Sequence, residues 1–410
     1  MPQPDRKDIL ILFSTRIVRL FCYGFVSVIL ALYLVQVGLS ERLIGLLFSL
    51  TLAGDVGVSL WLTTSADRFG RRRTLIVGAL LMVGAGVAFL FTRNLILLAV
   101  AAIIGVISPS GNEIGPFLSV EQASLTQLIS GEKRTQTFAW YALSGSLATA
   151  TGALVSGWLA QGLQGNGFSA FNAYRLVLAG YAIGGLVMAG MFFSLSKAVE
   201  IDPAGRVEQK LFLGLHRSKS VVMRLSGLFA LDAFGGALLV QSLLAYWFHV
   251  KYGVDTGVLG SIFFGANILA GFSALFAARI AKRFGLINTM VFTHIPSNIL
   301  LILVPLMPNL PLAITALLAR FSISQMDVPT RQSYTMAVVA PNERSAASGV
   351  TTIARSVGAA FSPSLAGVLM AVPVLFSVPF FLSGGLKIVY DLLLFNSFRG
   401  HKPPEEKEAR

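Results

Sequence analysis

The chain has 410 residues, of which 55% are apolar and only 12% are charged. Since a soluble protein is about 25% charged, this composition excludes a water-exposed globular surface and predicts a protein whose surface faces lipid. The net charge of +13, from 32 Lys and Arg against 19 Asp and Glu, falls in short basic runs between apolar segments, so we expect a lipid bilayer as partner and no nucleic acid.

Twelve apolar segments follow one another along the chain, and each is long enough for a spanning helix, which needs about 20 residues. They lie at residues 11–36, 43–64, 74–92, 95–128, 137–161, 174–196, 223–248, 256–279, 286–307, 310–337, 346–371 and 376–397. The first is too long for the apolar core of a signal peptide, so we expect it to remain in the mature chain. The pattern predicts an all-α membrane protein with 12 transmembrane helices.

Lys and Arg residues outside these segments fall mostly in alternate loops, such as the loop with Arg71, Arg72 and Arg73. Basic residues accumulate in cytoplasmic loops, so we expect both termini to be cytoplasmic. The single cysteine, Cys22, excludes a disulfide within the chain and a cysteine metal cluster. Short extracytoplasmic loops and the lack of disulfides fit a bacterial inner membrane.

The two parts of the chain repeat one another. Residues 65–71 match residues 280–286, and both stretches contain Arg-Phe-Gly. Six predicted helices lie on each side of a polar segment, which predicts an N-terminal half at 1–196, a cytoplasmic central loop at 197–222, a C-terminal half at 223–398 and a cytoplasmic tail at 399–410. Two halves in the same orientation indicate a parallel repeat, in which the substrate site lies between the halves near the middle of the membrane.

The most specific motif follows the second span and reads Asp-Arg-Phe-Gly-Arg-Arg-Arg from Asp67. Gly70 permits a tight turn that other residues resist, and the Asp67 carboxylate can accept hydrogen bonds from arginines or from a helix N-terminus. With its twelve spans and the partial second copy, the chain resembles the major facilitator superfamily over essentially its whole length. The resemblance implies two six-helix halves that rock in alternating access. It also implies a cytoplasmic gate formed by Asp67, Arg68, Gly70, Arg71 and Arg72.

A second pattern resembles, more weakly, the motif GxxxGPxxGG of drug/proton antiporters. Span eleven reads Gly358-x-x-x-Ser362-Pro363-x-x-Ala366-Gly367, and the matching stretch of span five lacks the proline. Small residues also allow ordinary close packing of helices, so both interpretations stay open. Exporters of the family often carry an arginine in span four, and the corresponding region of this chain has none.

Charged residues within spans are rare and usually face a cavity or an opposite charge. Arg19 in span one and Asp232 in span seven lie at near-equivalent positions of the two halves, and the family resemblance implies that these spans line the cavity together with spans four and ten. Arg320, Asp327 and Arg331 share one face of span ten. The residues predicted to contact the substrate are Arg19, Asn112, Asp232, Arg320, Gln325, Asp327, Arg331 and Arg355. The alternative for each charge is a structural ion pair.

Glu113 lies among Pro and Gly residues that interrupt span four, and interrupted helices mark transporter sites. Burial favours the protonated form of a carboxyl group, so Glu113 is the first candidate for a proton carrier and Asp55 in span two is the other. Lys387 and Asp391 are one helical turn apart in span twelve, where we expect a structural pair. We expect His294 in span nine to be packed rather than to bind a ligand.

The sequence predicts a transporter and not an enzyme, since it contains neither a phosphate-binding GxxxxGK[ST] loop nor a zinc-binding HExxH pair. We expect a monomer without cofactor or metal that exports a small organic molecule by alternating access, with protons as the coupling ion. The alternative is export or uptake of a small anion such as an organic acid or an oxyanion, because guanidinium groups pair well with carboxylates and oxyanions.

Overall fold

The computed structural model describes residues 6–129, 131–200, 215, 218–340 and 343–400. The side chains of residues 64, 65, 67, 68, 131–135 and 345 lie outside this description. Within these ranges all regular secondary structure is helical, which confirms the predicted all-α class.

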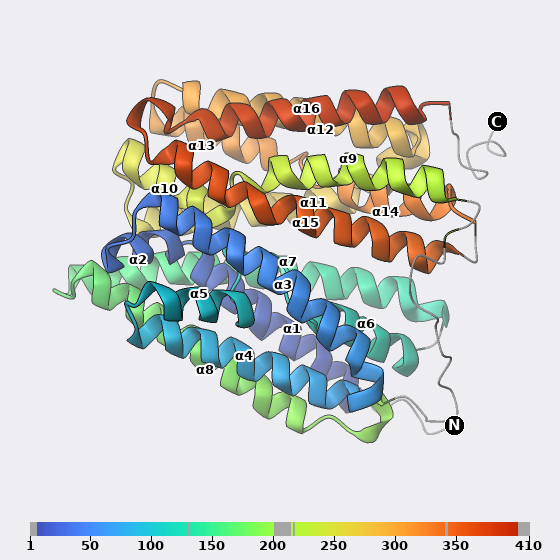
Figure 1. The fold of residues 1–410 in the computed structure, drawn as a ribbon, viewed down its shortest axis with the longest axis horizontal. Coiled ribbons are helices and arrows are strands. Elements are labelled where there is room, and N and C mark those ends of the chain that lie inside the picture. The colour runs from blue at the N-terminus through green and yellow to red at the C-terminus, as the bar shows by residue number, and fades with distance from the viewer. Residues whose placement is uncertain (1–5, 130, 201–214, 216–217, 341–342, 401–410) are drawn as a thin grey trace. The chain divides into compact units, whose positions relative to one another are not determined.

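The helices follow one another as labelled in Figure 1. They are α1 (Arg6–Ser27), α2 (Leu30–Val37), α3 (Glu41–Phe69), α4 (Arg71–Phe91), α5 (Leu95–Ile104), α6 (Phe117–Leu128), α7 (Gly131–Gly165), α8 (Ala170–Phe193), α9 (Lys219–Ala237), α10 (Gln241–Tyr252), α11 (Thr256–Phe284), α12 (Leu286–Leu303), α13 (Leu310–Phe321), α14 (Asp327–Ala337), α15 (Arg344–Met370) and α16 (Val378–Phe398). Short 3-10 helices occur at η1 (Lys197–Val199), η3 (Val304–Leu306) and η5 (Pro373–Leu375).

Each predicted span coincides with one long helix or with two helices separated by a break, which is longest in span four, at residues 105–116. The broken spans are one, four, seven and ten, which appear as the pairs α1–α2, α5–α6, α9–α10 and α13–α14. In the described part of the chain, nine helical stretches are long and apolar enough to cross a membrane, and α5 and α13 are shorter apolar helices of two broken spans. The breaks therefore fall in the same spans of both predicted halves.

By packing, the chain forms two units, Met1–Glu208 with Gln241–Phe264 and Gln209–Val240 with Gly265–Arg410. In the first unit α1 packs along α7 and α4 along α8, and α10 lies against α2. In the second unit α9 packs along α15 and α12 along α16, as Figure 1 shows. The division into halves at 197–222 rests on the sequence repeat and stays a prediction.

Glycines let the paired helices approach closely. A Cβ atom added to Gly24 of α1 would lie 2.0 Å from a backbone oxygen of α7, and one added to Gly152 of α7 would lie 2.0 Å from a backbone oxygen of α1. In the second unit, a Cβ atom at Gly358 of α15 would lie 2.4 Å from a backbone oxygen of α9. The small residues of the antiporter-like pattern therefore have a packing role.

The start of α10 contacts the breaks of spans one and four inside the first unit. Ser242 at the start of α10 donates its backbone N–H to the carbonyl of Pro109 at 3.0 Å. Its hydroxyl lies 2.7 Å from the carbonyl oxygen of Ser27 and 2.8 Å from that of Pro109. A broken helix frees backbone groups that find no water within a bilayer, so these polar contacts stabilise the breaks of spans one and four.

The loop of the signature motif is held by a carboxylate from the start of the central segment. Gly70 joins α3 to α4 with a φ of +100°, a conformation that favours glycine. Glu200 accepts hydrogen bonds from the backbone N–H groups of Arg71 at 2.7 Å and of Arg72 at 3.1 Å. The free N–H groups and positive dipole end of α4 favour an anion at this position, which explains why Glu200 binds there.

The arginines of this motif also reach neighbouring helices of the same unit. The Arg71 guanidinium donates to the side-chain oxygen of Gln127 in α6 at 3.0 Å. The Arg72 guanidinium donates to the last carbonyl of α8 at 2.5 Å. The side chains of Asp67 and Arg68, which the sequence places in the same gate, lie outside the described residues.

We expect Gly152→Ala to destabilise the protein by about 1–3 kcal/mol, because the new methyl group meets backbone rather than a side chain that can rotate away. Gly162→Ala, in the same helix with no atom within 4 Å of the added Cβ, is the matched control. Thermal unfolding of both variants in detergent measures the difference. Equal midpoints for the two variants would contradict the close approach of α1 and α7.

We expect Glu200→Gln to loosen the segment that follows α8, because two hydrogen bonds to a charged acceptor are worth about 1.5–3 kcal/mol each. Limited trypsin digestion should then cut the central segment several-fold faster than in the unchanged protein. Asp255→Asn, which removes an exposed carboxylate between α10 and α11, should leave the digestion rate unchanged. The same rate in Glu200→Gln as in this control would argue against the role of Glu200.

Candidate functional site

A first cluster of buried charges joins α1 to α6 within the first unit. Arg19 is fully buried, and its guanidinium forms a two-pronged ion pair with Glu121 at 2.8 and 2.6 Å. Its Nε donates to Glu113 at 2.6 Å, and Arg16 donates to the other oxygen of Glu113 at 2.8 Å. The hydroxyl of Tyr141 also donates to Glu121. The two guanidinium groups thus neutralise the two carboxylates, as buried charges require.

Glu113 is the accessible member of this first cluster. It lies in the break between α5 and α6, and its side chain is 15% exposed, whereas the Glu121 side chain is 0% exposed. Beside it, the Asp55 carboxylate of α3 accepts from the N–H of Gly115 at 2.6 Å and from the hydroxyl of Ser59 at 3.0 Å. Asp55 therefore supports the broken backbone of span four, while Glu113 takes part in the charge cluster.

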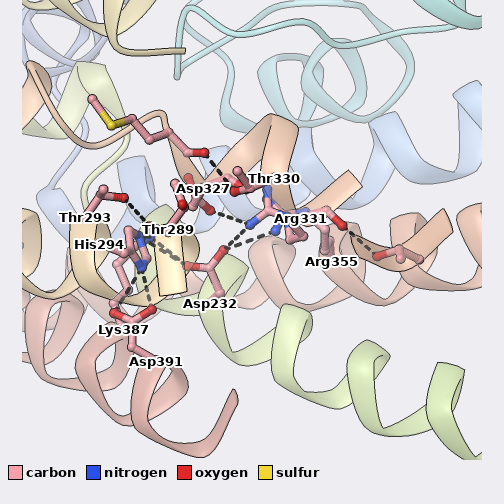
Figure 2. A network of polar contacts seen from close by, with 12 residues as sticks. Asp232, Thr289, Thr293, His294, Asp327, Thr330, Arg331, Arg355, Lys387 and Asp391 are labelled. Carbon is pink, nitrogen blue, oxygen red and sulfur yellow. Dashed lines mark hydrogen bonds and ion pairs between the residues drawn. The ribbon is translucent and has the colours of Figure 1, made fainter. Parts of the chain in front are cut away.

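A second cluster surrounds the carboxylate of Asp232 on α9 in the second unit (Figure 2). Its Oδ1 accepts from Nζ of Lys387 at 2.8 Å, and its Oδ2 accepts from Arg331 and from Arg355, each at 3.1 Å. Arg331 also pairs with Asp327 at 2.8 Å. The side chain of Asp232 is 4% exposed and that of Arg355 is 33% exposed. Arg355 is therefore the accessible edge of this cluster.

The same cluster continues to a histidine on α12. Nδ1 of His294 lies 2.9 and 3.1 Å from the two oxygens of Asp391, and its Nε2 lies 3.4 Å from Nζ of Lys387. Asn298 donates to Asp391 at 3.2 Å. In place of the expected pair within α16, Lys387 thus bonds Asp232 and Asp391 bonds His294. The reason is that α16 packs against both α9 and α12, so its two charged side chains turn to different neighbours.

The two clusters repeat each other with opposite sign. Arg19 pairs with Glu121, 102 residues further along the chain, and Asp232 pairs with Arg331, 99 residues further. In both units the first residue lies on the first helix of a broken span, and its partner lies on the second helix of the broken span that is three spans later. Both units therefore contain the ion pair, but the cation lies on the first of the two helices, α1, in the first unit and on the second, α14, in the second unit.

Three residues predicted to contact the substrate lie outside these ion pairs. In the described part of the chain, Arg320 in α13 has no carboxylate at ion-pair distance, and its buried Nε has no hydrogen-bond partner. Its guanidinium lies 4.8 Å from the ring centroid of Phe321. Gln325 lies in the break of span ten, where its backbone N–H donates to Ser273 at 3.3 Å. Asn112 is exposed in the break of span four.

Sequence reasoning did not select two residues that are central to the clusters. Glu121 could have been found from the sequence repeat, because its position in the first half corresponds to that of Arg331 in the second half, and Arg331 was predicted to contact the substrate. His294 had no such signal, because its partners Lys387 and Asp391 lie on another helix and only the packing of α12 on α16 brings them together. Among the described residues, no group of three or more His, Cys, Asp or Glu could hold a metal ion.

Solved structures of transporters share this fold. A bacterial homolog of the human lysosomal transporter Spinster, in an inward-facing and occupied conformation, is 17% identical with a TM-score of 0.73, over 95% of this chain and 96% of its own. The nucleoside transporter NupG is 14% identical with a TM-score of 0.73, over 95% and 99%. The human organic anion transporter MFSD10 is 16% identical with a TM-score of 0.61, over 95% and 99%. At these identities the likeness shows the fold alone.

One relative is similar in sequence along nearly its whole length. It is the uncharacterized membrane protein YJR124C of Saccharomyces cerevisiae, which is 32% identical over 424 residues, covering 96% of this chain and 94% of that protein. Residues 12–363 of the chain also match the sequence model of the Major Facilitator Superfamily. The chain therefore belongs to the Major Facilitator Superfamily and is an integral membrane transporter, not an enzyme.

Proposed function

We propose that the chain is a secondary transporter that carries a small organic anion by alternating access, with protons as the coupling ion. The observation that carries this proposal is the sharing of one carboxylate, that of Asp232, by Lys387, Arg331 and Arg355. Guanidinium groups bind carboxylates through paired hydrogen bonds, so a substrate carboxylate can take the place of a protein carboxylate beside them. Arg355 offers the first contact, because 33% of its side chain is exposed.

Arg320 supports the same proposal. An arginine that already has a carboxylate partner is less available to a substrate anion, and Arg19, Arg331 and Arg355 all have such partners. Arg320 has no such partner among the described residues. An unpaired guanidinium within a membrane is costly, and a bound anion would remove that cost. We therefore assign substrate contact to Arg320, Gln325 and Arg355.

We also propose that both termini are cytoplasmic, since the basic loops fall on that side. On this topology Gly70, Arg71 and Arg72 face the cytoplasm, and with Asp67 and Arg68 of the same motif they form the gate. The contacts of Glu200 support this proposal, because they fasten the central segment to the loop. Short loops without disulfides do not distinguish a bacterial inner membrane from a membrane of yeast, where a related membrane protein occurs.

A second candidate is proton-coupled export of a small organic molecule, with Glu113 as the proton carrier. In its favour, the Glu113 side chain is 15% exposed in the break of span four, where a proton can reach it. Asp55 is less suited to this task because it holds the backbone of Gly115. The glycines of the antiporter-like pattern add nothing to this candidate, because Gly152 and Gly358 are explained by helix packing.

We expect the purified protein in proteoliposomes to transport at least one member of a panel of lactate, benzoate, succinate, citrate and phosphate. Arg355→Gln should lower kcat/KM for that anion by about 10–100-fold, since a hydrogen bond between charged groups is worth about 1.5–3 kcal/mol. Arg355→Lys should recover part of this loss, and Arg42→Gln, at an exposed position in α3, should change nothing. Transport of the anion at the unchanged rate in Arg355→Gln would refute the substrate contact.

The second candidate makes a different prediction in the same vesicles. A cationic or neutral compound imposed as a gradient should drive proton movement, and Glu113→Gln should reduce this movement by at least about tenfold, because the amide cannot carry a proton. Asp255→Asn is the control for loss of a carboxylate. The candidate is removed if the unchanged protein moves no protons with such compounds, or if Glu113→Gln moves them equally well.

A further inference from the structure

His294 is enclosed by charged groups from several helices, and no step of the proposed transport uses it. It is 4% exposed. The titratable and charged groups that face it from the helices around it are Lys387, Tyr390 and Asp391 on α16, Asp232 on α9, Asp327, Arg331 and Tyr334 on α14, and Arg320 on α13. His294 therefore lies within reach of both carboxylates and cations, at the centre of the second cluster.

The neighbours of His294 define which ring nitrogen holds the proton. Asp391 accepts hydrogen bonds, so Nδ1 at 2.9 Å is the nitrogen that donates. The ammonium group of Lys387 has donors only, so Nε2 at 3.4 Å offers its lone pair to Lys387. The contacts therefore place Nδ1 to donate to Asp391 and leave the lone pair of Nε2 facing Lys387, and Figure 2 shows the ring beside both residues.

The charges of the cluster balance only while His294 is neutral. The three cations Lys387, Arg331 and Arg355 face the three carboxylates of Asp232, Asp327 and Asp391. A proton on Nε2 adds one positive charge and turns this nitrogen into a donor. Its nearest carboxylate oxygen is Oδ1 of Asp232 at 3.9 Å, which already binds Lys387 at 2.8 Å. Protonated His294 and Lys387 would therefore compete for one oxygen.

We infer that Nε2 of His294 is a proton-binding site that couples proton uptake to the binding of an anion at Arg355. The inference rests on the proposed transport of an anion and adds the residue that couples it to protons. The proton comes from water and forms an N–H bond at Nε2, while the hydrogen bond from Lys387 to Nε2 is lost and no covalent bond breaks. Asp232, drawn toward His294, holds Arg355 less strongly, so Arg355 can bind the anion. The negative charge of the anion then offsets the positive charge of the proton.

The sign of this coupling follows from the charges. Proton and anion each bind more tightly when the other is present, since together they leave the charge of the cluster unchanged, and such coupling is reciprocal. An empty cluster and a cluster with both ligands carry the same net charge, whereas one ligand alone changes this buried charge by one unit. The two ligands therefore cross the membrane in the same direction.

The test measures proton and anion movement together in proteoliposomes of the full-length protein. Gradients of lactate, benzoate, succinate, citrate and phosphate are imposed one at a time, with a pH-sensitive dye and a radiolabelled anion in the same vesicles. The unchanged protein should move about one extra proton with each lactate or benzoate, the monovalent members of the panel, as the charge balance requires. His294→Gln should lower this ratio at least about tenfold whatever the transport rate. His249→Gln, in α10 of the other unit, is the matched control and should keep the ratio.

A second measurement needs no variant. Calorimetric titration of the unchanged protein in detergent with the anion that the vesicles transport, in two buffers of different ionisation enthalpy near about pH 6.5, reports the protons taken up on binding. No uptake overturns the inference. A ratio unchanged in His294→Gln also overturns it, and a ratio lost in Glu113→Gln alone moves the proton site to the first cluster. If the unchanged protein transports and binds no anion of the panel, the proposed function fails and the inference falls with it.

Discussion

One buried carboxylate, that of Asp232, determines how the helices of the second unit fit together. Its two oxygens hold three cations from α14, α15 and α16. Within a bilayer an unpaired charge is expensive, and removing one partner of a buried pair typically costs about 3–5 kcal/mol. Four helices are thus placed relative to one another by electrostatics at a single point, while close packing of α9 on α15 fixes their separation.

In the first unit, backbone groups as well as charged side chains need polar partners within the bilayer. Breaks in spans one and four free carbonyl and N–H groups that lipid cannot satisfy. Ser242 bonds the freed carbonyls of Ser27 and Pro109, and Asp55 bonds the freed N–H of Gly115. These contacts hold the segment that carries Glu113 in position beside Arg16 and Arg19. An accessible carboxylate at this depth therefore depends on polar residues that never touch a solute.

The sequence was sufficient to predict the class of fold and the position of each span, because hydropathy over about 20 residues is a strong signal. It also placed Arg19, Asp232 and Arg331 in the right spans, since charges within apolar segments stand out. The partners were harder to predict. Spacing along α16 suggested a pair of Lys387 with Asp391, yet each residue bonds a different helix. Partner choice depends on the rotation and packing of helices, and hydropathy carries no information on either.

The opposite polarity of the two ion pairs constrains how the sequence can drift. Reversing the sign of Arg19 alone would set a third carboxylate beside Glu113 and Glu121. Reversing Arg331 alone would set a third carboxylate beside Asp232 and Asp327 and would remove the cation that Asp327 pairs with. A repeated segment therefore cannot pass from one polarity to the other through single charge reversals without an unstable intermediate. The polarity can be exchanged if substitutions first replace both charged residues by neutral ones and later introduce the two charges at exchanged positions. The two halves therefore share one arrangement of helices, yet each keeps the polarity of its own ion pair.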